Sequence, residues 1–141
     1  MNVPTEVSLQ ALARLIQTNQ LDPDRWVTFP EHGFRHYVLW QHPETGARIA
    51  LLEVEPGGGF PVRHSHASNQ FMYCISGDYE YTHAHVRLKS GSFYMNPKDH
   101  PHGPTLAHTR SILLEMYDGL NAYETPVFHD DEFMQGFLNS A

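Results

Sequence analysis

The chain has 141 residues, of which 40% are hydrophobic and 18% charged, a composition typical of a folded domain. Its formal net charge of -7 makes nucleic acid and anionic membranes unfavourable partners. There is no signal-peptide pattern and no apolar run of membrane-spanning length, and the single cysteine cannot form an internal disulfide, so we expect a cytoplasmic protein.

Two helices are predicted, one toward each end of the chain. Residues 8–19 repeat leucine and isoleucine at helical spacing, after a threonine and a serine that could cap the first turn. Residues 130–138 could form a shorter helix that packs its apolar side chains inward. We expect one domain over residues 1–141, made of a helical segment over 1–24, a barrel over 25–120 and a C-terminal tail over 121–141.

Between these helices the sequence predicts β structure. Short stretches rich in aromatic and β-branched residues recur at intervals of about ten residues. Turn-forming residues separate them, among them Ser76–Asp78. The spacing favours an all-β antiparallel sandwich or barrel. The predicted strands are residues 35–40, 47–55, 70–75, 78–88, 92–96 and 110–118.

Eleven histidines are the unusual feature of the composition, and His64 and His66 begin the most distinctive stretch. In a strand, side chains two residues apart point to one face, so a strand here would aim both imidazoles at the same place. Gln70, Met72 and Cys74 share this parity, which suggests that the face is buried. A buried imidazole without a partner costs on the order of 1–3 kcal/mol, and a divalent metal ion would remove that cost. The alternative is a polar surface turn.

A third imidazole is available from a later stretch, where His100 and His102 follow predicted strand 92–96. His102 lies just past a turn and is the candidate ligand. His100 precedes a proline, and we interpret it as exposed. His83 and His85 form another His-x-His, which we interpret as a solvated hairpin turn, with an adventitious second metal site as the alternative.

These stretches resemble the two motifs of the cupin superfamily. The first motif is Gly, five residues, His-x-His, three or four residues, Glu, six residues and Gly, and residues 58–77 match it with Gln70 in place of the glutamate. The second is Gly, five residues, Pro-x-Gly, two residues and His, and residues 91–102 match it with Asp99 in place of the glycine. A wider likeness over residues 25–105 is to small single-domain metal-binding cupins of the dihydroxyacetophenone dioxygenase-like and acetylacetone-cleaving types.

The resemblance implies a jelly-roll cupin barrel, a double-stranded β-helix with an added N-terminal helix, in which one divalent metal ion is bound by His64, His66, Gln70 and His102. Glutamine brings no charge, so the site would keep the full 2+ charge and favour an enolate, phenolate or carboxylate ligand. Gln70 could instead hydrogen-bond beside the ligands. Histidine suits Fe, Mn, Ni, Cu, Co and Zn, and the oxygenase resemblance favours Fe(II).

Other residues are weaker candidates for catalysis or substrate binding. The ordinary roles of such residues, packing for strand tyrosines and solvent contact for charged groups, are the alternatives. Cys74 is interpreted as a small buried hydrophobe. The candidates are Tyr73, Tyr79, Tyr81 and Tyr94 as phenols, Arg48 and Arg63 as anion contacts, and Glu115 as a general base or a neighbour of the metal ligands.

We therefore expect a metal-dependent dioxygenase acting on a small diketone, hydroxyketone or similar oxygen-rich substrate, anionic or enolisable, without an organic cofactor. One alternative is a non-oxidative metal-dependent isomerase or lyase of a sugar acid or keto acid. Another is a non-catalytic metal- or ligand-binding or sensing cupin, because fold does not determine function. We expect no nucleic-acid or membrane partner, and the resemblance to small cupins implies a homodimer.

Overall fold

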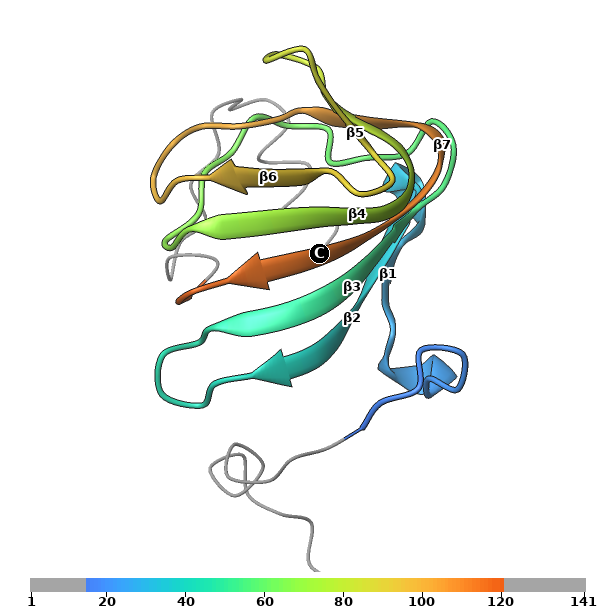
Figure 1. The fold of residues 1–141 in the computed structure, drawn as a ribbon, viewed down its shortest axis with the longest axis vertical. Helices are drawn as coiled ribbons and strands as arrows, with labels where there is room; N and C mark the ends of the chain where they lie inside the picture. Colours follow the sequence, from blue (N-terminus) through green and yellow to red (C-terminus); the bar gives the residue numbers. More distant parts are fainter. Residues whose placement is uncertain (1–14, 121–141) are drawn as a thin grey trace, which may run out of the picture.

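The computed structural model describes residues 15–120, which form an antiparallel β structure (Figure 1). Two short 3-10 helices, η1 (Pro23–Arg25) and η2 (Pro30–His32), precede and follow the first strand. The all-β class predicted from the strand spacing is confirmed. The strands are β1 (Val27–Phe29), β2 (Phe34–Gln41), β3 (Arg48–Val54), β4 (Gln70–Tyr81), β5 (Val86–Lys89), β6 (Phe93–Asn96) and β7 (Thr105–Tyr117).

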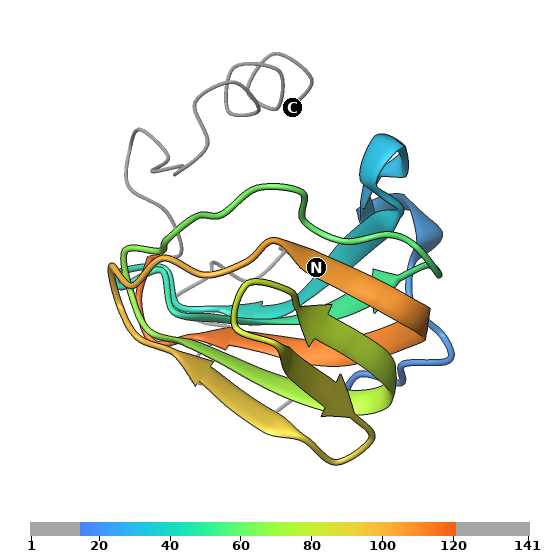
Figure 2. The same ribbon diagram turned by 90° about the horizontal axis from the view of Figure 1, so that it is seen from above.

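The strands pair in the order β1-β2-β3-β7-β4-β5, with β6 also paired to β4. Strand β4 therefore has β7 along one edge and β6 followed by β5 along the other. Figure 1 shows β2, β3, β7, β4 and β6 side by side from bottom to top. Seen from above, the long strands β4 and β7 curve around the interior (Figure 2).

An apolar layer fills part of this interior. Leu113 of β7 lies between Leu52 of β3 and Cys74 of β4 in the strand register, and all three are buried. Cys74 has no exposed surface, which confirms that it is a buried hydrophobe. The cluster is formed by Leu52, Val54, Met72, Cys74, Tyr79, Tyr81, Leu88, Ala107 and Leu113.

The expected turn at residues 76–78 is wrong, because β4 continues through it. Pairing with β7 shifts register at three places between Cys74 and Tyr79, so the turn-forming residues make bulges that bend the strand. Gly77 adopts φ +116°, and a Cβ there would lie 2.5 Å from the Cα of Ser111 in β7. The predicted strand 78–88 is correspondingly divided between the end of β4 and the start of β5.

The N-terminal helix predicted over residues 8–19 is described only from residue 15, and residues 15–19 are irregular rather than helical. The rest of that helix, the helix predicted over 130–138 and the tail over 121–141 lie outside the described residues. None of the helices between residues 15 and 120 has the length and apolar character that a membrane span requires.

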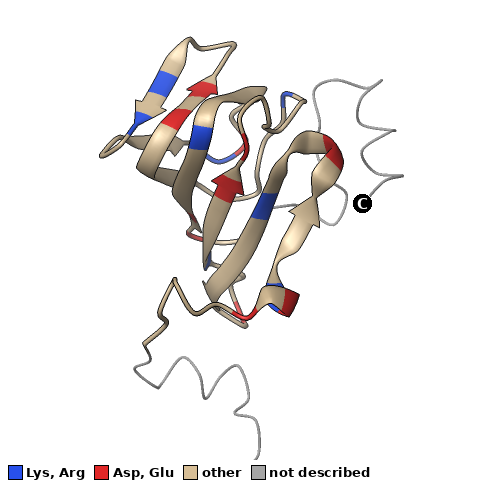
Figure 3. Ribbon diagram, turned by 90° about the vertical axis from the view of Figure 1, so that its right-hand side faces the viewer, with Lys and Arg blue, Asp and Glu red and all other residues tan. Residues whose placement is uncertain are grey.

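Charged residues of both signs are spread over the strands and loops of the described chain (Figure 3). Arg35 contacts Glu53 at 2.7 Å with 42% of the arginine side chain exposed, and such surface pairs contribute little to stability. The pair of Arg48 and Glu115 differs, because their side chains are only 14% and 13% exposed. This pair lies inside the barrel, next to the histidines.

We predict that Gly77→Ala lowers the free energy of unfolding by about 2–4 kcal/mol, because alanine would need a left-handed φ and would also overlap the β7 backbone. Gly91→Ala is the matched control, since Gly91 has φ +87° but no atom lies within 4 Å of a Cβ placed there. Gly91→Ala should lower the free energy of unfolding by only about 1–2 kcal/mol. Urea unfolding followed by tryptophan fluorescence measures both, and equal losses would contradict the steric explanation.

Candidate metal centre

Two loops, one before β4 and one after β6, bring the candidate histidines together. His64 N–H donates to the carbonyl of His102 at 2.9 Å, and His102 N–H donates to the carbonyl of His64 at 2.8 Å. Residues that exchange hydrogen bonds across an antiparallel bridge project their side chains to the same side. Asp99 N–H also donates to the carbonyl of His66 at 3.0 Å, so the second loop holds the third histidine as well.

The three imidazoles form a compact cluster. Their ring centroids are 4.4–4.8 Å apart, and the nitrogens that could bind a metal ion all lie within 4.8 Å of one another. His64 and His102 are buried and His66 is half-buried. Nitrogens bound to one ion at about 2.0–2.1 Å are roughly 3–4 Å apart, so small ring movements would suffice. Within residues 15–120, no other group of three histidine, cysteine or acidic side chains is placed in this way.

The hydrogen bonds of two of the rings suit metal binding. His64 Nδ1 lies 3.0 Å from the carbonyl oxygen of Val62, and His102 Nδ1 lies 3.1 Å from that of His100. A carbonyl can only accept, so in both rings Nδ1 carries the proton and Nε2 carries the lone pair. Metal-bound histidines are oriented in this manner, and the donor set therefore fits a divalent ion. The ring of Phe60 packs 4.2 Å from that of His64 and adds an apolar neighbour.

A row of polar side chains crosses the interior beside the histidines. Arg48 of β3, Tyr117 of β7, Gln70 of β4 and Asn96 of β6 occupy paired positions of neighbouring strands. Asn96 Nδ2 donates to Gln70 Oε1 at 2.8 Å, and Gln70 Nε2 donates to Tyr117 Oη at 2.9 Å. The Tyr117 ring centroid lies 5.0 Å from that of His66, so the polar row contacts the histidine cluster.

Glu115 lies next to this row, two residues before Tyr117 on the inward face of β7. Its Oε2 accepts a hydrogen bond from Gln70 Nε2 at 3.3 Å, and its Oε1 lies 3.7 Å from Arg48 Nη2. Burial raises the pKa of the Glu115 carboxyl, and the Arg48 charge with hydrogen bonds from Tyr117 and Gln70 partly opposes that rise. The solvent-facing alternative for Glu115 is therefore wrong.

The amide of Gln70 matches this environment better than a carboxylate would. Its oxygen accepts from Asn96, while its NH2 group donates to both Tyr117 and Glu115. A glutamate at position 70 would place a second carboxylate against Glu115 and remove the donor. Coordination of the ion by Gln70 stays a prediction, and its oxygen has a second lone pair for that purpose.

The tyrosine candidates divide between the interior and the outer surface. Tyr81 is buried, with its ring centroid 6.1 Å from that of His102, and burial raises the pKa of its hydroxyl well above the ordinary value. Tyr79 is buried and donates to Thr105 Oγ1 at 2.7 Å, which is a packing role. Tyr73 is 40% exposed on the outer face of β4, so the structure does not bring it into the site.

The remaining candidates lie apart from the cluster. His83, His85 and His100 are exposed, as expected for turn residues. Arg63 is half-buried, and its Nε is buried without a hydrogen-bond partner among the described residues. Tyr94 packs its ring against Tyr81, with centroids 5.0 Å apart.

The sequence reasoning placed His64 and His66 in one strand with Gln70, and this step is wrong although the two rings do lie together. His64 forms an isolated bridge and His66 lies in a loop, so neither belongs to a strand continuous with Gln70. The rings nevertheless converge. Asn96 and Tyr117 were missed as neighbours of the site, and strand alternation was the available signal, because Asn96 has the parity of Tyr94 and Tyr117 that of Glu115.

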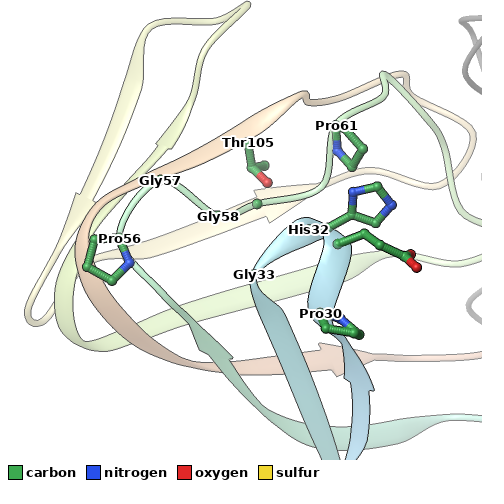
Figure 4. Close-up of a pocket in the computed structure, with 10 residues that line it drawn as sticks. Pro30, His32, Gly33, Pro56, Gly57, Gly58, Pro61 and Thr105 are labelled. Atoms are coloured by element: carbon green, nitrogen blue, oxygen red, sulfur yellow. The ribbon is translucent and has the colours of Figure 1, made fainter.

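A separate cleft of about 410 Å³ lies between η2 and the loop that follows β3 (Figure 4). Glu31 and His32 of η2 face residues 57–59, Pro61 and Thr105 across it. None of the three clustered histidines lines this cleft, and much of its wall is glycine and proline. The candidate metal chemistry therefore belongs to the histidine cluster.

Comparisons with known proteins find one matching family model and several solved structures of similar fold. A family model, the ChrR cupin-like domain, matches residues 13–120. An acetylacetone dioxygenase from Acinetobacter johnsonii has a TM-score of 0.61 at 17% identity, covering 92% of this chain and 96% of that chain. KdgF from Halomonas sp. has a TM-score of 0.62 at 16% identity, covering 80% and 97%.

The structure of Rhodobacter sphaeroides SigE in complex with the anti-sigma ChrR has a TM-score of 0.57 at 21% identity, covering 72% of this chain and 51% of that chain. A search of the curated proteins finds no match. At such identities, the solved structures show a shared fold alone.

We predict that the protein binds close to one divalent ion per chain and that His102→Ala lowers the affinity at least about 100-fold, because one of three imidazoles is lost. His83→Ala removes an exposed histidine and is the matched control. Elemental analysis after chelation and reloading with Zn(II) measures the metal content. Retention of the ion by His102→Ala would contradict this assignment.

The contact between Gln70 and Glu115 gives a second prediction. In the metal-free protein, Gln70→Glu should lower the free energy of unfolding by about 1–3 kcal/mol, because a second buried carboxylate would replace the amide that donates to Glu115. Adding Glu115→Gln restores one amide and one carboxylate, so the double variant should recover most of the loss. Urea unfolding of the two single variants and the double variant measures the coupling, and additive effects would show that these side chains act independently.

Proposed function

The chain belongs to the ChrR cupin-like domain family, and on that premise we propose that it is a metal-dependent dioxygenase of a small enolisable diketone, hydroxyketone or related substrate. The observation that carries the proposal is the convergence of three imidazoles within 4.8 Å. His64, His66 and His102 would hold the ion, with Gln70 Oε1 as a proposed fourth ligand. Fe(II) is the proposed metal, because the proposed reaction uses dioxygen and Fe(II) is the ion of many non-haem oxygenases.

A divalent ion bound there would supply Lewis-acid stabilisation of an enolate oxygen and activation of dioxygen. The chain contributes a neutral ligand set, since three imidazoles and an amide leave the charge of the ion uncompensated. Such a site favours anionic oxygens over neutral ones. The Val62 and His100 carbonyls hold two of the rings in the required orientation. Cleavage of one carbon–carbon bond would place both atoms of dioxygen in the two products.

A binding or sensing role is the second candidate. The family match to the ChrR cupin-like domain favours it, together with the fold shared with the complex of SigE and the anti-sigma ChrR. In that role the ion would organise the site without turnover. The two candidates differ in whether any small molecule is consumed.

We predict that the Fe(II)-loaded protein consumes dioxygen when it is given at least one member of a panel of diketones and hydroxyketones. One molecule of dioxygen should be consumed for each molecule of substrate. An oxygen electrode measures uptake, and His102→Ala loaded under the same conditions gives the background rate. The Zn(II)-loaded protein should show no uptake. Anaerobic turnover of a keto acid or sugar acid would instead favour an isomerase or lyase, and no turnover of any substrate would favour the binding role.

A further inference from the structure

Arg48 is an unusual arginine, because it lies inside the barrel with donors unused. Its side chain is 14% exposed, and its Nε is buried without a hydrogen-bond partner in the described part of the chain. Its contact with Glu115 spans 3.7 Å, which is too long for a hydrogen bond. A guanidinium has five N–H donors, and burying them without acceptors is unfavourable.

The position of Arg48 relates it to the histidine cluster. Its Cζ lies 5.3 Å from the ring centroid of Tyr117, and that centroid lies 5.0 Å from the ring centroid of His66. Arg48 and Tyr117 are also directly paired across β3 and β7. Tyr117 therefore neighbours both the guanidinium and one of the imidazoles on the interior face of the sheet.

The interior around Arg48 favours negative charge. Glu115 is the only acidic side chain within 4 Å of the guanidinium among the described residues. The pKa of His36, on the inward face of β2, is lowered to about 4, chiefly by burial and additionally by the positive charge of Arg48. The charge of Arg48 therefore still acts on other interior groups despite its partner, and it would stabilise an anion that entered beside it.

We propose that the partly exposed guanidinium of Arg48 binds a carboxylate oxygen of the substrate, whose ketone or enolate end lies at the histidine site. This inference rests on the proposed function and narrows its substrate class from neutral diketones to small keto acids. The guanidinium has donors to spare, because Nη2 lies 3.7 Å from the nearest oxygen of Glu115, and the Tyr117 ring supports its face. If Arg48 served only as the partner of Glu115, any preference for a carboxylate would come from the bound ion and would survive in Arg48→Met.

The test measures binding by calorimetry to the Zn(II)-loaded protein, with pyruvate and 4-oxopentanoate as probes and the methyl ester of each as its neutral control. We expect at least one acid to bind about tenfold more tightly than its ester, a typical gain from one charged contact. Arg48→Met should abolish this preference and Arg48→Lys should retain part of it. Arg35→Met removes the same charge from the outer surface and should leave the preference unchanged.

Arg48→Met leaves Glu115 without its cationic neighbour, so the double variant Arg48→Met/Glu115→Gln provides a second sample in which both charges are absent. The proposal is overturned if the wild type does not prefer either acid over its ester, or if the preference survives in Arg48→Met or the double variant. Metal content is measured in the same samples. If the metal-loaded wild type shows no carboxylate preference, only this inference is overturned, whereas absence of bound metal in the wild type overturns the proposed function.

Discussion

The site depends on the two backbone hydrogen bonds that His64 and His102 exchange. Because an antiparallel bridge directs both side chains to one side, the position of these imidazoles is set by the backbone rather than by side-chain contacts alone. Each ring is then held by the carbonyl two residues earlier, Val62 for one and His100 for the other. A site prearranged in this way loses little conformational freedom when it binds an ion.

The second constraint is the strand register that aligns the polar row. The apolar pairing of Leu52, Leu113 and Cys74 specifies this register, because a shift of one residue would turn every inward side chain outward. The same register then places Gln70 between two hydrogen-bond partners. Packing of the apolar layer thus determines which polar groups meet beside the histidines, and the bulges near Gly77 bend β4 only beyond this region.

Sequence patterns predicted the parts of this molecule that depend on short-range spacing. The likeness to two gapped motifs selected His64, His66 and His102, whose rings lie together in the structure, and the parity of Gln70, Met72 and Cys74 correctly indicated a buried face of β4. The contact of Glu115 with Gln70 could not be predicted, because it depends on which strands are neighbours. The prediction of a turn near Gly77 was wrong because the close approach of β7 is not visible in the local sequence. A glycine at such an approach permits a bulge as readily as a turn.

The charges inside the barrel explain how one amide affects both folding and ligand choice. Among the described residues beside the histidines, Glu115 and Arg48 are the charged pair, while Gln70, Asn96 and Tyr117 are neutral. A divalent ion would therefore leave this interior positive although the whole chain carries -7, and the attraction to an entering anion would be strong where water is excluded. A carboxylate at position 70 would halve that positive charge and repel Glu115. Because the Gln70 amide donates to Glu115, the side chain that fits this interior would also keep the proposed metal site receptive to anionic ligands.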